Sequence, residues 1–210
     1  MKLHNRPFHW WGDIWTKPST RSLSDLLEQH VLQQSEADWL IDHIGAGRSL
    51  IVATEASRAG KSTLAHALLE ETPANRERIY IRGTYEPFDW LEEADPGTVT
   101  LLVNEFSPDL PVYCWGQPAK RVLELAAQGF QVIGCMHGET VGDLATQLAG
   151  KDVGATLTEI AALDTVVFRN AEVDPTCRFH HVSSIETLTV VGGTVIGTPV
   201  PIAHHNLAIR

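Results

Sequence analysis

The residues best suited to chemistry form a short loop between an apolar run and a helical pattern. Its sequence, Glu55-Ala56-Ser57-Arg58-Ala59-Gly60-Lys61-Ser62-Thr63, matches the Walker A pattern GxxxxGK[ST] at every position except the first. In such a loop the first backbone N–H groups of the helix converge on a phosphate, the lysine reaches the outer phosphates and the hydroxyl ligates magnesium. We therefore predict a nucleotide-binding loop formed by Ser57, Arg58, Ala59, Gly60, Lys61, Ser62 and Thr63, with Ser62 as the magnesium ligand.

A Gly-Lys-Ser tripeptide also has a simpler interpretation, in which a helix starts there, Lys61 is solvated and Ser62 is a cap residue. The apolar strand before the loop and the helix after it favour the phosphate-binding interpretation. Glu55 stands where the pattern has glycine, lacks the freedom of glycine at positive φ, and brings a carboxylate near the expected phosphates. This substitution predicts weakened or lost nucleotide binding.

Two further polar residues each follow an apolar run of strand length. Glu105 follows the run 98–103, and His137 follows the run 130–135. Ligands of parallel α/β sheets bind at the carboxyl ends of the strands, so both side chains are expected near the phosphate loop. Glu105 suits the Walker B task of orienting an attacking water, and His137 could hydrogen-bond the γ-phosphate. Taken singly, each also has a plain interpretation as a polar residue in the turn after a strand.

Strands and helices alternate along the segment that holds these residues. The expected helices cover residues 19–32, 35–44, 61–71, 117–128 and 142–149. The expected strands cover residues 49–54, 78–82, 98–103, 130–135, 165–168, 183–191 and 194–196, the last two joined by a Gly192-Gly193 turn. This alternation predicts an α/β fold with a mainly parallel sheet flanked by helices and an antiparallel C-terminal tail.

The composition of the chain argues against nucleic acid as a partner and indicates the state of its cysteines. The chain has 210 residues, with 16 Lys and Arg against 26 Asp and Glu, for a formal net charge of -10. Such a chain without a run of basic residues is not expected to bind nucleic acid. Three widely spaced cysteines, Cys114, Cys135 and Cys177, indicate buried thiols in a reducing compartment.

The amino-terminal segment 1–18 is set apart by three of the six tryptophans, Trp10, Trp11 and Trp15. Residues 19–210 are expected to form a single phosphate-loop domain. Neither a signal sequence nor an apolar run of the roughly 20 residues that cross a bilayer is evident, so we expect a cytoplasmic protein without a membrane span.

The order of these pieces resembles one family, the core ATPase domain of type II and type IV secretion and pilus motor ATPases. The resemblance lies in SLIVATEASRAGKSTLAHALLEE, in TLLVNEFSPD with Asn104-Glu105 in place of the Gly-Glu pair of Walker B, and in the "His box" ending at Met136-His137. It implies a RecA-like P-loop NTPase that uses magnesium and ATP in a ring of six subunits. It also implies that Lys61 holds phosphates, Ser62 magnesium and Glu105 the catalytic water, with His137 as the γ-phosphate sensor.

The chain departs from that family at four places. About 18 residues precede the first expected helix, where the family has an amino-terminal domain. Ile81-Arg82-Gly83-Thr84 lacks the family's acidic box, Ser107 replaces the arginine after Walker B, and Glu55 replaces a glycine. The transition-state arginine is not identified, with Arg58, Arg121 and a neighbouring subunit's Arg76 or Arg78 as candidates.

Two functions therefore remain open, and a third is weaker. We favour a compact, divergent ATPase that binds Mg-ATP and serves a secretion or pilus assembly. The alternative is a non-catalytic pseudo-ATPase that acts as an interaction or regulatory subunit of such an assembly. A small-molecule kinase is a weaker interpretation, because the chain has no evident arginine-rich lid.

Overall fold

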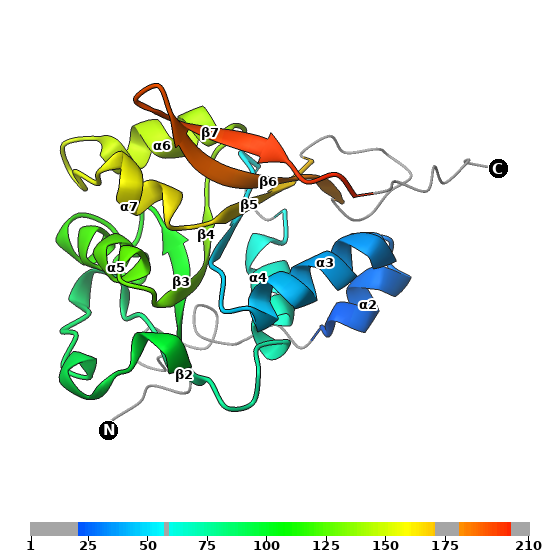
Figure 1. Ribbon diagram of the computed structural model, residues 1–210, viewed down its shortest axis with the longest axis horizontal. Coiled ribbons are helices and arrows are strands. Elements are labelled where there is room, and N and C mark those ends of the chain that lie inside the picture. Colours follow the sequence, from blue (N-terminus) through cyan, green and yellow to red (C-terminus); the bar gives the residue numbers. More distant parts are fainter. Residues whose placement is uncertain (1–20, 57–58, 171–180, 203–210) are drawn as a thin grey trace.

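A computed structural model describes residues 21–56, 59–170 and 181–202, which build a seven-stranded sheet (Figure 1). The strand order across the sheet is β2-β3-β4-β1-β5-β6-β7. The strands are β1 (Leu50–Ala53), β2 (Glu77–Tyr80), β3 (Val99–Phe106), β4 (Gln131–Met136), β5 (Thr165–Arg169), β6 (Val182–Val191) and β7 (Thr194–Pro199).

The sheet is parallel over its first five strands and antiparallel at one edge. β1 pairs in parallel with both β4 and β5, and β3 pairs in parallel with β2 and β4. β6 runs antiparallel to β5, and β7 returns along β6 as a hairpin. The expected α/β fold with an antiparallel C-terminal tail is confirmed.

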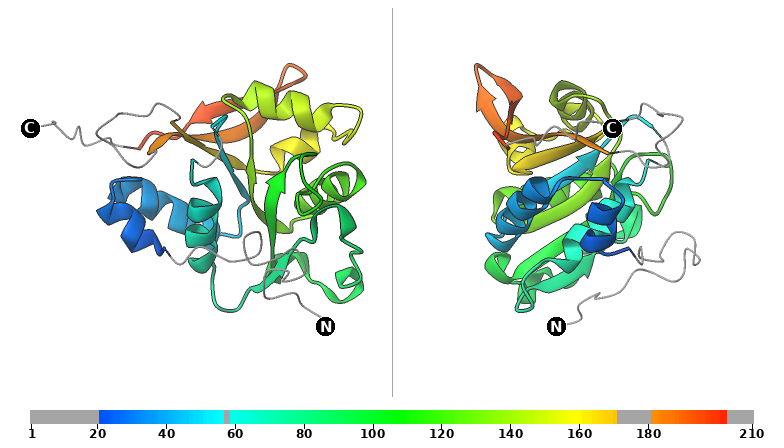
Figure 2. Two further views of the ribbon diagram at one scale, coloured as in Figure 1. Left: turned by 180° about the vertical axis from the view of Figure 1, so that it is seen from behind. Right: turned by 90° about the vertical axis from the view of Figure 1, so that its right-hand side faces the viewer.

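Helices cover both faces of the sheet (Figures 1 and 2). They are α2 (Leu23–Glu28), α3 (Gln34–Gly45), α4 (Lys61–Glu70), α5 (Gln117–Ala127), α6 (Val141–Ala149) and α7 (Leu157–Ala161). Each face of the sheet carries its own hydrophobic core, and alternate residues of β1 point into one or the other. Leu50 and Val52 lie in the core with α2, α3 and α4. Ile51 and Ala53 lie in the core with α5, α6 and α7. The sheet is therefore the middle of three layers.

Several expected boundaries were wrong. α2 covers only Leu23–Glu28, because Ser22 and Asp25 form a capping box at its start and His30 adopts a positive φ soon after its end. α7 was not expected, since a five-residue helix carries too little periodicity to detect. Short 3₁₀ turns, at Gly83–Tyr85, Leu91–Glu93 and Pro96–Thr98, lie between β2 and β3.

The third strand is longer than expected, with consequences for Glu105. β3 continues to Phe106, so Asn104 and Glu105 lie inside the strand and not after it. Its pairing with β4 shifts register between Val103 and Phe106, which marks a bulge at Asn104-Glu105. A bulge turns the local side chains relative to the regular pleat, and bulges are frequent beside active sites.

Some expectations concern residues outside the described ranges. These are the tryptophan-rich segment 1–18, the loop residues Ser57 and Arg58, and Cys177. Cys114 and Cys135 are buried free thiols, as expected, and burial raises the pKa of Cys135 to about 12. Among the described helices, none has the length and apolar character that a bilayer crossing requires.

A substitution at Gly83 tests how tightly the turn after β2 packs on the loop 107–115. Its φ is +60°, and a Cβ there would overlap the carbonyl oxygen of Pro111. Gly83→Ala should lower the free energy of unfolding by about 3 kcal/mol, the sum of left-handed strain and overpacking. Gly154→Ala is the matched control, because its φ is +68° with nothing within 4 Å of the added Cβ. Urea unfolding should show a loss of only about 1 kcal/mol there, and equal losses in the two variants would contradict the packing argument.

Candidate functional site

The phosphate-loop sequence lies where the fold presents a helix N-terminus at the carboxyl edge of the sheet. β1 ends at Ala53 and α4 begins at Lys61, so the loop connects a central strand to a helix on one face. Gly60 is the N-cap residue with φ 77° and ψ 24°, and it has no side-chain oxygen to offer the amides of the first turn. Those N–H groups give this end of α4 a partial positive charge that favours an anion.

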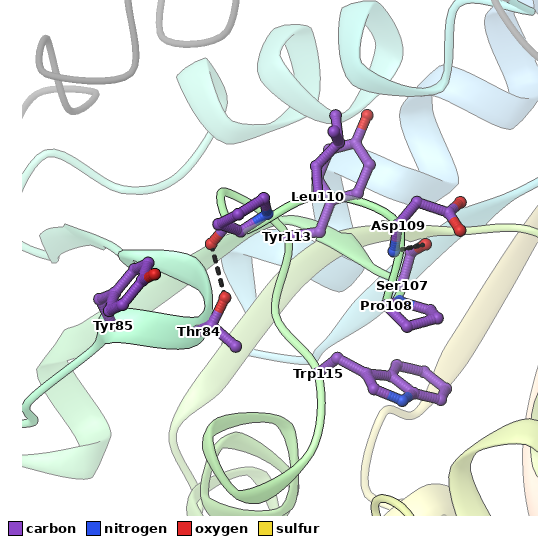
Figure 3. Close-up of a pocket in the computed structure, with 9 residues that line it drawn as sticks. Thr84, Tyr85, Ser107, Pro108, Asp109, Leu110, Tyr113 and Trp115 are labelled. Carbon is purple, nitrogen blue, oxygen red and sulfur yellow. Dashed lines mark hydrogen bonds between the residues drawn. The ribbon is translucent and has the colours of Figure 1, made fainter.

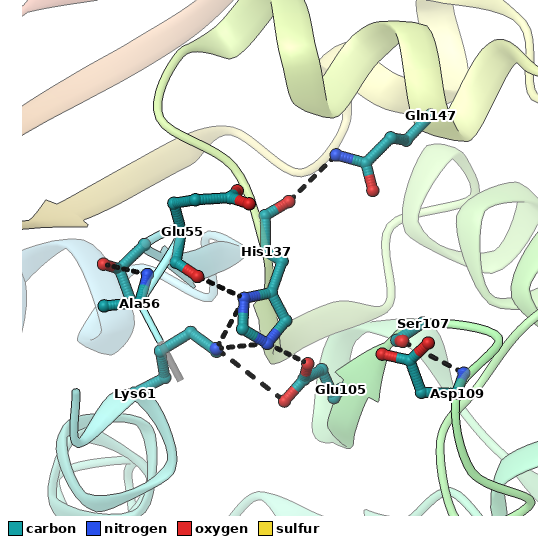
Figure 4. A network of polar contacts seen from close by, with 9 residues as sticks. Glu55, Ala56, Lys61, Glu105, Ser107, Asp109, His137 and Gln147 are labelled. Carbon is teal, nitrogen blue, oxygen red and sulfur yellow. Dashed lines mark hydrogen bonds and ion pairs between the residues drawn. The ribbon is translucent and has the colours of Figure 1, made fainter. Parts of the chain in front are cut away.

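Lys61 turns back from α4 toward the ends of the neighbouring strands (Figure 4). Its side chain is 6% exposed, and Nζ lies 3.0 Å from Nε2 of His137 and 3.9 Å from Oε2 of Glu105. The solvated lysine of the simpler interpretation is therefore wrong. Three residues that sequence reasoning selected separately, Lys61, Glu105 and His137, are in mutual contact.

Glu105 is placed by the bulge of β3 and is also 6% exposed. Its Oε1 lies 3.0 Å from Nε2 of His137, a contact that lacks the alignment of a hydrogen bond. Burial raises the pKa of Glu105, whereas the charges of Lys61 and His137 lower it in part. Glu105 is thus a more basic carboxylate than usual, held beside a cation.

His137 follows β4 and is fixed from two sides. Its Nδ1 lies 3.0 Å from the carbonyl oxygen of Glu55, and the amide of Gln147 on α6 donates to the carbonyl of His137 at 2.9 Å. With a proton on Nδ1, the ring donates to Glu55, and Nε2 is left to accept from Lys61. In that arrangement Lys61 and Glu105 balance each other in charge around the imidazole.

Glu55, which stands in place of the first glycine of the loop pattern, has an ordinary backbone conformation. It has no positive φ, so its position makes no demand for glycine. Its carbonyl faces His137, while its carboxylate points away from Lys61 (Figure 4). It borders a cavity of about 550 Å³ at the ends of β1, β4 and β5 together with Thr54, Gly138, Glu139, Phe168, Arg169, Asn170 and Ser183. The expected weakening of nucleotide binding by Glu55 stays a prediction.

The remaining described loop residues surround the start of α4. Ala59 is buried, Ser62 is exposed and Thr63 is half-buried. Within the described ranges there is no cluster of three or more His, Cys, Asp and Glu side chains that could hold a metal ion by themselves. Ser62 is exposed as a residue, but its side chain is a hydrogen-bond partner of the buried thiol of Cys135.

Sequence reasoning missed Arg169. It ends β5 next to β1, is 6% exposed, and donates from Nη1 to the carbonyl oxygen of Gly60 at 2.6 Å. The rule that selected Glu105 and His137, a polar residue directly after an apolar run at a carboxyl edge, also selects Arg169, which follows Phe168.

A second hollow borders the site on the β3 side (Figure 3). This groove of about 490 Å³ follows the loop after β3, and its most exposed aromatic side chain is Tyr85, at 62%. Burial and the negative charges of Glu105 and Asp109 raise the pKa of Tyr113 within it. The groove is lined by Thr84, Tyr85, Ser107, Pro108, Asp109, Leu110, Pro111, Tyr113 and Trp115.

Comparisons with known proteins give a likeness of structure and not of sequence. No protein-family profile and no curated protein matches the chain. Among solved structures, it is similar to the VirB11 ATPase from the Brucella suis type IV secretion system in complex with sulphate, with 19% identity and a TM-score of 0.48 over 82% of this chain and 65% of that one. It is also similar to the Legionella pneumophila ATPase DotB, with 17% identity and a TM-score of 0.46 over 88% of this chain and 51% of that one. The chain thus spans less than two thirds of either protein's length, and at this level neither structure assigns a role to any of its residues.

The raised pKa of Glu105 predicts a pH dependence of stability. The folded protein holds this proton more tightly than the unfolded chain, so the group's contribution to stability is full below the ordinary carboxyl pKa of 4.5 and is lost as pH rises through the folded-state pKa. The free energy of unfolding of the parent minus that of Glu105→Gln, measured from about pH 4 to about pH 7.5, should therefore fall as pH rises, by roughly 1.4 kcal/mol per unit of pKa difference.

Glu159→Gln provides the opposite case for the same measurement. Burial acts to raise the pKa of Glu159, but hydrogen bonds from Lys120 and Thr156 outweigh it and lower the pKa. Its contribution is present above the ordinary pKa of 4.5 and is lost as pH falls below it, so the corresponding difference should rise with pH in a measurement extended down to about pH 2.5. A flat Glu105 difference across this range would show that its carboxyl has an ordinary pKa.

Proposed function

We propose that this protein is a divergent P-loop ATPase that binds Mg-ATP and hydrolyses it, of the kind that drives secretion and pilus assemblies. The observation that carries the proposal is the convergence of Lys61, Glu105 and His137, from α4, β3 and the end of β4, on one point beside the N-terminus of α4. A structural role alone does not require a buried lysine and a buried carboxylate to meet an imidazole at that edge.

Binding would exchange one set of charges for another. The ammonium of Lys61, now in contact with Glu105 and His137, would turn to the β- and γ-phosphates, and the amides at the start of α4 would hold the phosphate chain. Ser62 would ligate magnesium, which supplies further positive charge opposite the phosphates. The affinity then depends on how far the new interactions with phosphate outweigh the internal interactions that Lys61 gives up.

Hydrolysis would use the two groups that Lys61 leaves behind. Glu105 would orient the attacking water and accept its proton, a task that suits a carboxylate whose pKa is raised by burial. His137, fixed through Glu55 and Gln147, would hydrogen-bond the γ-phosphate and couple its presence to the last turn of α6 through Gln147. Preorganised donors of this kind stabilise the charge that develops in phosphoryl transfer.

One observation favours the alternative of a pseudo-ATPase. The nearest carboxylate to the position of the missing acidic box, Glu86, is buried and accepts from the backbone of Arg82 and Phe88 and from the indole of Trp90. Both carboxylate oxygens of Glu86 thus accept hydrogen bonds within this turn. Binding without turnover would identify the protein as such a subunit, and a ring of six or a secretion or pilus partner is proposed in either case.

Lys61→Ala tests the phosphate loop. Calorimetric titration with Mg-ATP should show affinity at least about a hundredfold lower than in the parent, because a charge-assisted contact to phosphate is lost. The matched control is Lys120→Ala, which removes a lysine that pairs with Glu159 away from the loop and should bind as the parent does. Unchanged binding in Lys61→Ala would remove the loop from the proposal.

Glu105→Gln separates binding from chemistry. The amide keeps the size of the side chain but cannot take a proton from water, so phosphate release from ATP should fall about 10²- to 10⁴-fold while ATP still binds. Asp109→Asn changes a carboxylate in the neighbouring groove and should leave the rate within about threefold. Turnover at the parent rate in Glu105→Gln would exclude Glu105 as the base.

A further inference from the structure

Arg169 links β5 to the phosphate loop through one backbone group. Its Nη1 donates to the carbonyl oxygen of Gly60, and the same oxygen accepts from the backbone N–H of Leu64 at 3.1 Å. That second bond is the first one of α4. The guanidinium therefore holds the carbonyl at which the helix begins, and so the direction in which the first amides of α4 point.

The contact also restricts residue 60. Gly60 has φ +77°, and a Cβ added there would lie 2.9 Å from Nη1 of Arg169. The close approach of the guanidinium to the backbone depends on the missing side chain. The hydrogen bond thus joins two segments of the chain that are 109 residues apart, and it needs glycine at residue 60 as well as arginine at residue 169.

The position of the charge is unusual for a helix start. Burial lowers the pKa of Arg169 to about 10, which leaves it positively charged near neutral pH. A cation at a helix N-terminus adds to the positive end of the helix dipole, and that interaction between the two is unfavourable. The same charge becomes favourable when phosphate is bound beside it, so its effect differs between the empty and the occupied loop.

We propose that Arg169 is a positioning residue of the phosphate loop, which holds Gly60 and the first turn of α4 in the geometry that binds the nucleotide's phosphates. This inference rests on the proposed function. The sequence had offered Arg58, Arg121 and a neighbouring subunit's Arg76 or Arg78 as arginines of the site. Arg169, at the end of a strand, is a further one. Arg169 acts through the Gly60 carbonyl, and its removal should loosen the loop before it affects any other part of the sheet.

Two variants separate the hydrogen bond from the fold. Arg169→Met removes the donor and keeps an apolar side chain of similar length at a buried position, so the strand is expected to persist. Arg169→Lys keeps a charged donor that can reach the same carbonyl. The control is Arg48→Met, which removes an arginine paired with Asp164 at the opposite end of β1 and β5.

The first measurement is amide hydrogen exchange without nucleotide. In Arg169→Met, the amide of Leu64, which donates to the Gly60 carbonyl, should exchange at least about tenfold faster than in the parent, while the amides of β6 and β7 stay unchanged. Arg169→Lys should lie within about threefold of the parent, and Arg48→Met should leave the Leu64 amide unchanged. Parent-like exchange at Leu64 in Arg169→Met would overturn the inference without reference to ATP.

The second measurement is Mg-ATP affinity by calorimetry on the same proteins. Arg169→Met should bind at least about tenfold more weakly, with Arg169→Lys restoring most of the loss. If exchange increases but affinity does not fall while Lys61→Ala abolishes binding, Arg169 is only structural and the inference fails while the proposed function stands. If the parent protein does not bind Mg-ATP, the proposed function fails and takes the inference with it.

Discussion

The buried ammonium of Lys61 is the constraint on which the rest of the site depends. A charge removed from water is tolerated only if opposite charge and hydrogen-bond acceptors lie within reach. The chain supplies both from two adjacent strands, Glu105 from β3 and His137 from the end of β4, and β4 in turn is the neighbour of β1. A different strand order would separate these groups. The partners of the buried lysine therefore depend on the order of the strands in the sheet.

Each neighbouring element contributes to holding these groups. The bulge in β3 sets the position of Glu105, the carbonyl of Glu55 fixes one side of the His137 ring, and α6 fixes its backbone through Gln147. The two hydrophobic layers hold the strands on which the cluster is built. Packing thus sets the distances between the strand ends, and backbone carbonyls and one amide set the orientation of the side chains.

The sequence predicted the class of fold and selected three residues that the structure brings into contact, because both depend on regular patterns. Apolar runs give strands, and polar residues that follow them in a parallel sheet gather at one edge, which is why Glu105 and His137 could be selected without coordinates. The bulge could not be predicted, since it follows from the pairing of two strands and not from either sequence. The direction of the Glu55 side chain and the contact between Arg169 and Gly60 also depend on the loop's three-dimensional path. The structure describes neither Ser57 nor Arg58, so their expected part in the loop stays a prediction.

The pairing of Gly60 with Arg169 has a consequence for how this protein can change over generations. At most left-handed positions, asparagine is the residue that can replace glycine at modest cost. Here any side chain at residue 60 also meets a guanidinium 2.9 Å from its first carbon. A lineage that replaced the glycine would have to move the guanidinium of Arg169 aside, and a lineage that replaced the arginine with an apolar residue would remove a donor from the Gly60 carbonyl. A change at either position therefore alters which residues the other position tolerates, although the two are 109 residues apart in the chain.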